Sequence, residues 1–438
     1  MNRDDTNSRR YFRLRTGHEP VTNDRNVERR LAVEAARRPN PNGASSMKST
    51  SVRSWLWKRS RSGRVLVDRL RGRLGPAEPT TSGRICRDVA AWSLEHQSAR
   101  PRELFPGREV VRRPPGTVEP SVDPVFTDRL HHRHGRRYIT PVDGARLVGS
   151  AGLVVLPDRS AAVESVFWDH ILETIPEFAT PSRRSVERRR GPHFSLLVPW
   201  THRSNFYHWF HDSLLRLHDV IDDLPDDTSY LVPGWMQPFQ YETLALFGIG
   251  RDRLVHCTGH TIIDMETLHF ATATSASGHH RAEADRWLSQ RMRTALGVDA
   301  DGGDRRIYLS RRNASRRVAN ESDVVDLLAD FGFEVVVPDT LSLREQVVTF
   351  AQASTIVGAH GAALYNMIHS PEGAVVIDMI GPSLLRNGYI FWNQAQELGH
   401  DYWYLKTSST DPADGQADTV VPLDRLEATL AAAGISRR

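Results

Sequence analysis

The run NFYHWFHDSLLRL, residues 205–217 of this 438-residue sequence, holds side chains whose types and spacing suit proton transfer. His208 and Asp212 are four residues apart, so in a helix they share one face. A carboxylate beside an imidazole can accept the proton of an attacking hydroxyl, which is general-base catalysis. Such a pair also forms purely structural hydrogen bonds, and the spacing alone leaves both interpretations open.

A second candidate site begins with Arg311 and Arg312, which follow the strand-like run RIYLS and precede Arg316 and Arg317. Guanidinium groups bind phosphate oxygens in a bidentate way and stay charged at any working pH. A diphosphate is therefore the ligand that this run fits best. A solvated basic loop is the alternative interpretation.

The segment GAHGAALYN, residues 358–366, predicts a glycine-bounded turn that opens a helix. Gly358 and Gly361 allow the backbone to approach a ligand closely, and the first N–H groups of a helix favour a bound anion. His360 can donate to a phosphate or a sugar, although a histidine that only caps the helix is the alternative. The segment is not a G-x-G-x-x-G fingerprint, so no nicotinamide cofactor is expected.

Alternating strand-like and helix-like runs surround these residues. Two runs have apolar residues at helical spacing, Glu321–Phe331 and Ser342–Ala353, and the second opens with a capping box of Ser342 and Glu345. The strand-like runs are short and rich in β-branched residues: Arg306–Ser310, Glu334–Pro338, Ser354–Gly358 and Ala374–Met379. This alternation predicts an α/β fold with a parallel sheet covered on both faces. Because ligands bind at the carboxyl ends of such strands, the chemistry is expected directly after these runs.

A first α/β domain is expected upstream, because the apolar runs at Arg146–Pro157 and Phe194–Pro199 end at proline and are typical of buried strands. Residues 76–140 are rich in Pro, Arg and Gly and predict a linker or an irregular segment. They contain a histidine cluster, His131, His132 and His134. The cluster does not predict a metal site, since neighbouring arginines would repel a cation and no carboxylate completes the spacing.

The N-terminal segment differs from the rest in charge. Residues 1–74 contain 19 Lys and Arg against 7 Asp and Glu, a net charge of +12, so the chain total of +4 leaves −8 for the remainder. Residues 1–50 have few large apolar groups and are expected to be mostly disordered. Residues 51–74 mix apolar and basic side chains, which fits an amphipathic segment in a membrane interface or a helix that packs on the body. Nucleic acid is not an expected partner, because no recognised binding motif accompanies the charge.

Composition narrows the class of protein and its compartment. Hydrophobic residues make up 39% and charged residues 25%, which is ordinary for a folded, soluble protein. Cys86 and Cys257 are too few for a disulfide framework, so a reducing compartment is expected. No run approaches the roughly 20 apolar residues of a membrane span. We expect a cytoplasmic protein, with residues 51–74 as the candidate for peripheral contact with the inner face of the cell membrane.

Several of these segments, in this order, resemble glycosyltransferase family 61, whose bacterial members include capsular polysaccharide biosynthesis proteins formerly described as a domain of unknown function. The run at 205–217 is similar to the family's Asn-x-x-His-x-x-x-Asp/Glu motif, and the stretch from RIYLSRR to AVVIDM resembles its catalytic region. The run FWNQAQELGHDYWYL is also family-like. Ala359 departs from the family, in which bacterial relatives often have Pro, and SLLR at 213–216 replaces a frequent x-Leu-Pro-Arg.

The resemblance implies a GT-B fold, in which two Rossmann-like domains face a cleft, behind a basic and partly disordered extension. It implies an inverting, metal-independent glycosyltransferase that moves a sugar from a nucleotide-sugar, above all a UDP-sugar, to a hydroxyl of a glycan or lipid-linked glycan in surface or capsular polysaccharide biosynthesis. No cofactor and no metal are expected. The expected divisions are the extension 1–75, the linker 76–140, the N-terminal acceptor-side domain 141–275, the C-terminal nucleotide-sugar-binding domain 276–410 and the C-terminal tail or helix 411–438.

Position by position, the resemblance also implies roles for individual residues. Asp212 is implied as the base that deprotonates the acceptor, with His208 as its catalytic partner. Asn205 and His211 are expected on the acceptor side. The residues implied to bind the donor are Arg311, Arg312, Gly358, His360, Gly361 and Asn366. The alternative function is a catalytically silent protein of the same fold that binds sugar nucleotides or acts as a scaffold, and the acid at Asp212 argues against it.

Overall fold

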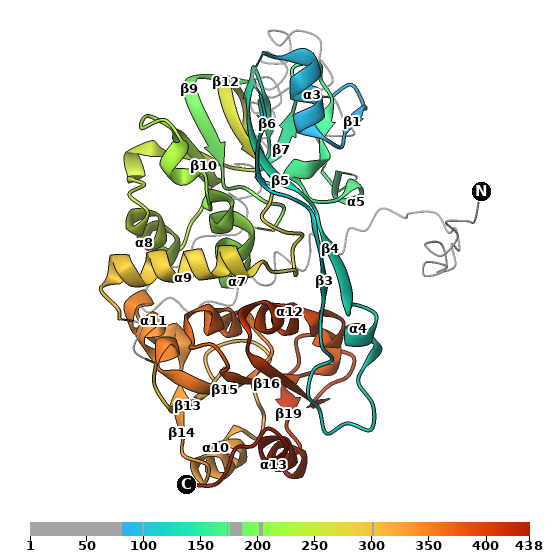
Figure 1. Ribbon diagram of the computed structural model, residues 1–438, viewed down its shortest axis with the longest axis vertical. Helices are drawn as coiled ribbons and strands as arrows, with labels where there is room; N and C mark the ends of the chain where they lie inside the picture. The colour runs from blue at the N-terminus through green and yellow to red at the C-terminus, as the bar shows by residue number, and fades with distance from the viewer. Residues whose placement is uncertain (1–80, 99, 173, 176–185, 201–204, 300–301) are drawn as a thin grey trace, which may run out of the picture. The chain divides into compact units, whose positions relative to one another are not determined.

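The computed structural model describes residues 81–98, 100–172, 174–175, 186–200, 205–299 and 302–438 (Figure 1). Residues Gly75–Arg438 form one compact unit, to which all the elements below belong. The predicted extension at 1–75, with its candidate membrane segment at 51–74, lies outside the described residues. Within the described residues, no helix combines the length and the apolar character that crossing a bilayer requires.

A five-stranded parallel sheet forms the second half of the unit, with the strand order β14-β13-β15-β16-β17. Its strands are β13 (Arg305–Leu309), β14 (Phe333–Val336), β15 (Ala353–Ala359), β16 (Val375–Ile380) and β17 (Asp401–Lys406). Successive residues point to opposite faces, so Ile307 and Ile356 enter one apolar core while Tyr308 and Val357 enter another. The predicted α/β character and the burial of both faces are confirmed.

Helices cover both faces of this sheet. On one face lie α10 (Glu321–Ala329) and α13 (Leu423–Ala432); on the other lie α11 (Leu343–Ala351), α12 (Tyr389–Leu398) and the 3-10 helix η8 (Ala362–His369). The capping box is present, because the side chains of Ser342 and Glu345 each accept the other's backbone N–H. The sequence predicts an ordinary helix after Gly361, but the structure has the tighter η8, whose last six residues are all buried. The remaining short elements are η7 (Pro338–Thr340), η9 (Pro382–Asn387), β18 (Ser408–Ser409) and β19 (Thr419–Val420).

The first half of the unit contains a mixed ten-stranded sheet with the order β1-β8-β7-β6-β12-β9-β10-β11, in which β5 pairs with β12 and β2 pairs with β5. Its parallel part is β12 (Ile262–Ala271), β9 (Glu187–Ser195), β10 (Ser229–Pro233) and β11 (Leu254–Cys257). The other strands are β1 (Ile85–Cys86), β2 (Arg102–Phe105), β5 (Arg137–Asp143), β6 (Arg146–Val148), β7 (Leu153–Val155) and β8 (Ala161–Ala162). The predicted strand region at 146–157 is the hairpin β6–β7, and that at 194–199 begins at the end of β9.

The helices of this half are short apart from α9. They are α3 (Val89–His96), α4 (Pro124–Thr127), α5 (Asp169–Leu172), α8 (Pro238–Leu246), α9 (Ala282–Leu296), η1 (Val163–Ser165), η5 (Ile221–Asp223) and η6 (Arg251–Arg253). α9 contacts α8 on the side of the first sheet and α11, α12 and η8 on the side of the second. One apolar cluster includes Phe194 of the first sheet and Ile307 of the second. The GT-B arrangement and the division near residue 275 therefore stay predictions.

The prediction of a linker at 76–140 is wrong, because this segment carries α3, α4, β1, β2 and the antiparallel ribbon of β3 (Arg108–Val111) and β4 (His131–His134). Arg108 of this segment is not a solvated linker residue, because it ion-pairs with both Glu283 and Glu397. These partners are distant in sequence, so no local pattern shows them. The histidines of β4 belong to no candidate metal group among the described residues.

Candidate active site

The run that carries His208 and Asp212 contains three types of helix in succession. It is α-helical over α7 (Phe206–His208), π-helical over η3 (Trp209–Ser213) and 3-10 over η4 (Leu214–Leu217). The predicted helical stretch is present, although it is not one regular α-helix. Asn205 caps its start, where the side-chain oxygen accepts the His208 N–H. π-Helical turns are rare and are found frequently at functional sites.

His208 and Asp212 are in contact, as their spacing predicts. Nδ1 of His208 lies 2.6 Å from Oδ2 of Asp212, and an ionised carboxylate only accepts, so the imidazole donates. Oδ2 also accepts the indole N–H of Trp200 at 2.5 Å and the hydroxyl of Ser277 at 3.1 Å. The side chain of Asp212 is 1% exposed, whereas that of His208 is 29% exposed. The accessible member of the pair is therefore His208.

Asp212 keeps its negative charge although it is buried. Burial by itself raises the pKa of this carboxyl, but the hydrogen bond from His208 and the other polar neighbours outweigh it, and the pKa lies below its ordinary value. The Oδ1 atom is buried without a hydrogen-bond partner among the described residues. A negative Asp212 holds the His208 proton on Nδ1 and leaves Nε2 to accept another.

His211, predicted on the acceptor side, is buried behind this pair against His280, with ring centroids 4.0 Å apart. Both of its ring nitrogens lack a partner among the described residues, and burial lowers its pKa to about 3, so the ring is neutral. Ligand atoms of His211, His280 and Asp285 lie within 4.8 Å of one another, a spacing that can hold a metal ion. His280, however, already bonds Asp285 through Nδ1 at 2.8 Å and Tyr207 through Nε2 at 3.1 Å. A metal would have to replace these hydrogen bonds.

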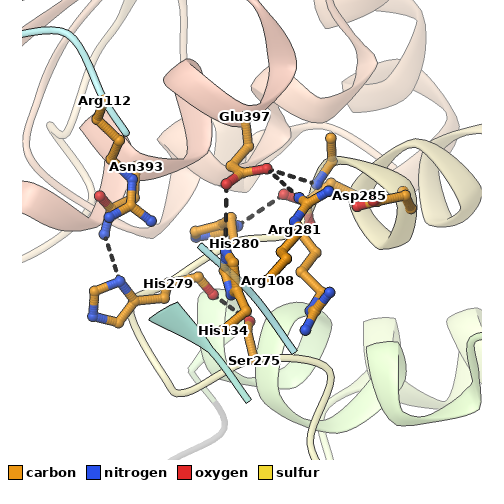
Figure 2. A network of polar contacts seen from close by, with 12 residues as sticks. Arg108, Arg112, His134, Ser275, His279, His280, Arg281, Asp285, Asn393 and Glu397 are labelled. Atoms are coloured by element: carbon orange, nitrogen blue, oxygen red, sulfur yellow. Dashed lines mark hydrogen bonds and ion pairs between the residues drawn. The ribbon is translucent and has the colours of Figure 1, made fainter. Parts of the chain in front are cut away.

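A polar network fixes the start of α9, the helix that carries Asp285 (Figure 2). Glu397 of α12 accepts from Arg108 at 2.8 Å and from the Ala282 N–H at 3.4 Å, and it lies 3.4 Å from Nε2 of His134. The ribbon β3–β4, α12 and α9 thus meet at one carboxylate. This contact fixes the start of α9, the helix that carries the buried Asp285.

On the second sheet, Arg311 directly follows β13 and lies against Gly361. A β-carbon on Gly361 would be 1.8 Å from Nη1 of Arg311, so the guanidinium fills the space that any larger residue would need. Nη2 donates to the Ser315 carbonyl at 2.9 Å, and Nε is buried without a partner among the described residues. Burial, and after it the charge of Arg316, lowers the pKa of Arg311 to about 10, which leaves it protonated at neutral pH.

Arg316 is the second cation of this cluster. Neither Arg311 nor Arg316 forms an ion pair with a carboxylate of the described residues, in contrast to Arg312 and Arg317. Nε of Arg316 is also buried without a described partner, and its φ of +57° is uncommon for a residue other than glycine. Two neighbouring cations without an ion-paired counter-charge favour an anion that can bridge them.

His360 follows β15 and is held by two residues that the sequence does not single out. Its Nδ1 lies 2.7 Å from Oδ2 of Asp378, which also accepts the hydroxyl of Tyr402 at 2.7 Å. Asp378 on β16 and Tyr402 on β17 are buried. Because Asp378 accepts the hydrogen bond from Nδ1–H, Nε2 of His360 is left for a ligand, as an acceptor when the ring is neutral or a donor when it is protonated.

Three further residues predicted to bind the donor have other partners. Arg312 lies 3.7 Å from Glu321. The amide of Asn366 donates to Gln346 at 3.1 Å from inside the core. Gly358 is buried in β15, where a β-carbon would meet a neighbouring side chain at 3.0 Å. The structure therefore gathers Arg311, His360 and Gly361 and leaves these three outside the cluster.

An aromatic ring links the two clusters. The ring of Phe391 on α12 lies 4.9 Å from that of His360 and 5.8 Å from that of Tyr207, the residue before His208. Phe391 thus contacts both the residue before His208 and the residue before Gly361.

Four residues of the site are missed by the sequence analysis: Trp200, Ser277, Asp378 and Tyr402. Asp378 gives a usable signal, since it is the one carboxylate in the apolar run AVVIDM. Trp200 and Ser277 are 12 and 65 residues away from Asp212, and no local pattern connects them with it.

The site thus combines an imidazole–carboxylate pair with two arginines that have no ion-paired carboxylate among the described residues, and with a close glycine at the carboxyl edge of a parallel sheet. Residues 206–377 match the family model described as Glycosyltransferase 61. This part of the chain, which carries both His208–Asp212 and Arg311–Gly361, is therefore similar to that family.

Curated relatives are distant and cover part of the chain. The α-1,3-arabinosyltransferase XAT3 of Oryza sativa subsp. japonica is 23% identical over 40% of this chain and 34% of its own length. The protein O-linked-mannose β-1,4-N-acetylglucosaminyltransferase 2 of Takifugu rubripes is 24% identical over 53% of this chain and 46% of its own length. The xylan glycosyltransferase MUCI21 of Arabidopsis thaliana is 23% identical over 53% of this chain and 55% of its own length. The chain thus spans between a third and just over half of these relatives.

Proposed function

We propose that the protein transfers a sugar from a nucleoside diphosphate sugar to a hydroxyl of a glycan acceptor. Two observations carry this proposal: a buried, ionised Asp212 is paired with His208, and two arginines, Arg311 and Arg316, have no ion-paired carboxylate among the described residues. Nε2 of His208 takes the acceptor proton, and Asp212 stabilises the imidazolium that forms. The exposures of the two side chains favour His208 as the proton acceptor over the Asp212 base that the family resemblance implies.

Departure of the nucleoside diphosphate leaves negative charge on its phosphates. Arg311 and Arg316 lie at the edge of the second sheet, where they can stabilise that charge. His360 is held at the same edge by its hydrogen bond to Asp378. Since two guanidinium groups supply this charge, we propose that transfer needs no metal. The finer parts of the proposal rest on the family resemblance. They are transfer with inversion from a UDP-sugar, closure of a GT-B cleft, a surface polysaccharide acceptor and a cytoplasmic location.

Thermal denaturation in excess EDTA tests this function. The ligands are UDP, GDP and CDP, together with UDP-arabinose, UDP-xylose and UDP-N-acetylglucosamine, chosen from the sugars in the relatives' names. A selective ligand at a hundredfold excess over its Kd should stabilise the wild type by about 2.7 kcal/mol. Arg311→Ala should lose that stabilisation.

Arg312→Ala is the matched control, because it removes an adjacent guanidinium that lies near Glu321 instead of Gly361. It should keep the nucleotide response. Absence of any response in the wild type, or equal losses in both variants, would count against the proposed donor site. A nucleotide response without transfer would favour a silent, sugar-nucleotide-binding protein.

A further inference from the structure

Three aromatic side chains gather beside the catalytic pair. Phe167 and Trp168 lie in the loop between η1 and α5, and Trp200 follows β9. The ring of Trp200 lies 5.4 Å from that of Phe167 and 5.5 Å from that of Trp168, and the latter two are 5.6 Å apart. All three side chains are only partly buried. They form an aromatic cluster; Trp200 also bonds Asp212, but the proposed reaction gives the three rings no role.

The backbone holds this cluster in an unusual conformation. Phe167 has a φ of +74°, in the left-handed region that bulky residues rarely adopt. Beneath it, the buried guanidinium of Arg216 lies 5.6 Å from the Phe167 ring and donates to the Ser165 carbonyl at 3.4 Å. The surrounding structure thus keeps an apolar ring at the surface and a cation under it. Conformations of this kind cluster at ligand sites, where the fold over-determines them.

Trp200 connects the aromatic cluster with the catalytic pair. Its indole N–H donates to Oδ2 of Asp212 at 2.5 Å, and its ring lies 5.6 Å from the ring of His208. A molecule resting on Phe167, Trp168 or Trp200 therefore lies next to the group that takes the proton in the proposed reaction.

We propose that Phe167, Trp168 and Trp200 bind the sugar ring of the acceptor by stacking. One face of a pyranose presents C–H groups with partial positive charge, and an aromatic face is negative, so the two attract while the ring edge keeps its hydroxyls free. A hydroxyl at that edge would reach His208. The donor is a poorer occupant, because its phosphates match Arg311 and Arg316 on the other sheet. This inference rests on the proposed function and adds to it the chemical class of the acceptor: a neutral pyranose.

Saturation-transfer NMR with the full chain and UDP tests this site. The probes are the methyl pyranosides of mannose and xylose, the sugars named in two relatives, and of glucose and galactose; mannitol is the ligand control, because it has the hydroxyls but no ring face. We expect transfer to the C–H protons of one face of at least one pyranoside and none to mannitol. Trp168→Leu should weaken binding roughly tenfold, and Trp168→Phe should restore most of it.

Trp287→Leu is the matched protein control. Trp287 is another partly buried tryptophan, but its ring contacts Phe247 and His218 on the α9 side. It should leave pyranoside binding unchanged. Phe167→Gly is a second test variant, since glycine tolerates the positive φ and removes only the ring; it should weaken binding as Trp168→Leu does.

The response to UDP separates the two hypotheses. If UDP stabilises the wild type and Trp168→Leu equally while the pyranosides bind only the wild type, the acceptor site is supported. If UDP binds but no pyranoside does, or if Trp168→Leu binds pyranosides like the wild type, the acceptor site is wrong and the proposed donor chemistry stands. If pyranosides bind through Trp168 and no nucleotide binds, the sugar site stands and the transferase proposal fails.

Discussion

The guanidinium of Arg311 occupies the position that the β-carbon of any other residue at 361 would take, with Nη1 only 1.8 Å from that point. Gly361 has a φ of 174°, which is extended backbone that every residue can adopt. The glycine is therefore required for space and not for backbone freedom. This relationship couples the end of β13 to the turn after β15 and sets the position of the proposed diphosphate site.

Gly361→Ala is expected to weaken nucleotide binding about 10- to 100-fold, the loss that follows when a charge-assisted hydrogen bond is removed. The added methyl group displaces the Arg311 guanidinium without straining the backbone. Isothermal titration with the nucleotide that stabilises the wild type measures the change. A double-mutant cycle supplies the control: in an Arg311→Ala background, Gly361→Ala should have almost no further effect. Additive losses would show that the glycine acts on the ligand directly.

Asp378→Asn is expected to lower nucleotide-sugar affinity or turnover roughly tenfold, because it weakens the charge-assisted bond that orients His360. Tyr402→Phe removes the other bond to Oδ2 of Asp378 and leaves the His360–Asp378 contact intact, so its effect should be smaller. Steady-state kinetics of the two variants give the comparison. A larger loss in Tyr402→Phe would mean that the buried tyrosine acts through the core and not through His360.

Stability should fall as the pH rises because of Asp285. Burial, offset in part by the Tyr365 hydrogen bond, raises the pKa of this carboxyl from 3.8 to about 7. The folded state then binds the proton more tightly than the unfolded state, so the stabilisation is fully present below about pH 4 and is lost as the pH rises through about 7. Asp285→Asn lacks this titration. Thermal melts between about pH 5 and pH 8 should show the wild type losing stability relative to the variant, and parallel curves would contradict the assignment.

Local patterns were sufficient for four of the five strands of the second sheet; β17 was not predicted. The runs at 306–310, 334–338, 354–358 and 374–379 are short and rich in β-branched residues, and the capping box of Ser342 and Glu345 marks the start of α11. Short segments of sequence are therefore enough to predict these strands and this helix. The His208–Asp212 contact follows in the same way from a four-residue spacing.

Contacts between distant segments could not be predicted in this way. The segment 76–140 lacks long apolar runs, and its strands are held by partners such as Glu283 and Glu397, far along the chain. Arg311 and Arg312 are adjacent and have the same side chain, so the sequence does not distinguish their roles. In the structure, Arg311 lies against Gly361 and Arg312 lies near Glu321. The bonds from Trp200 and Ser277 to Asp212 likewise depend on tertiary structure.

The most direct test of the account is transfer of a labelled sugar from the stabilising nucleotide-sugar to a pyranoside acceptor in excess EDTA, by the wild type, His208→Gln and Asp212→Asn. Asp222→Asn, which removes an exposed carboxylate paired with Arg291, is the control. The account predicts that the wild type and Asp222→Asn transfer sugar, and that both site variants bind the donor normally but turn over about 10²- to 10⁴-fold more slowly. No transfer by the wild type, or transfer by His208→Gln and Asp212→Asn at the wild-type rate, would contradict it.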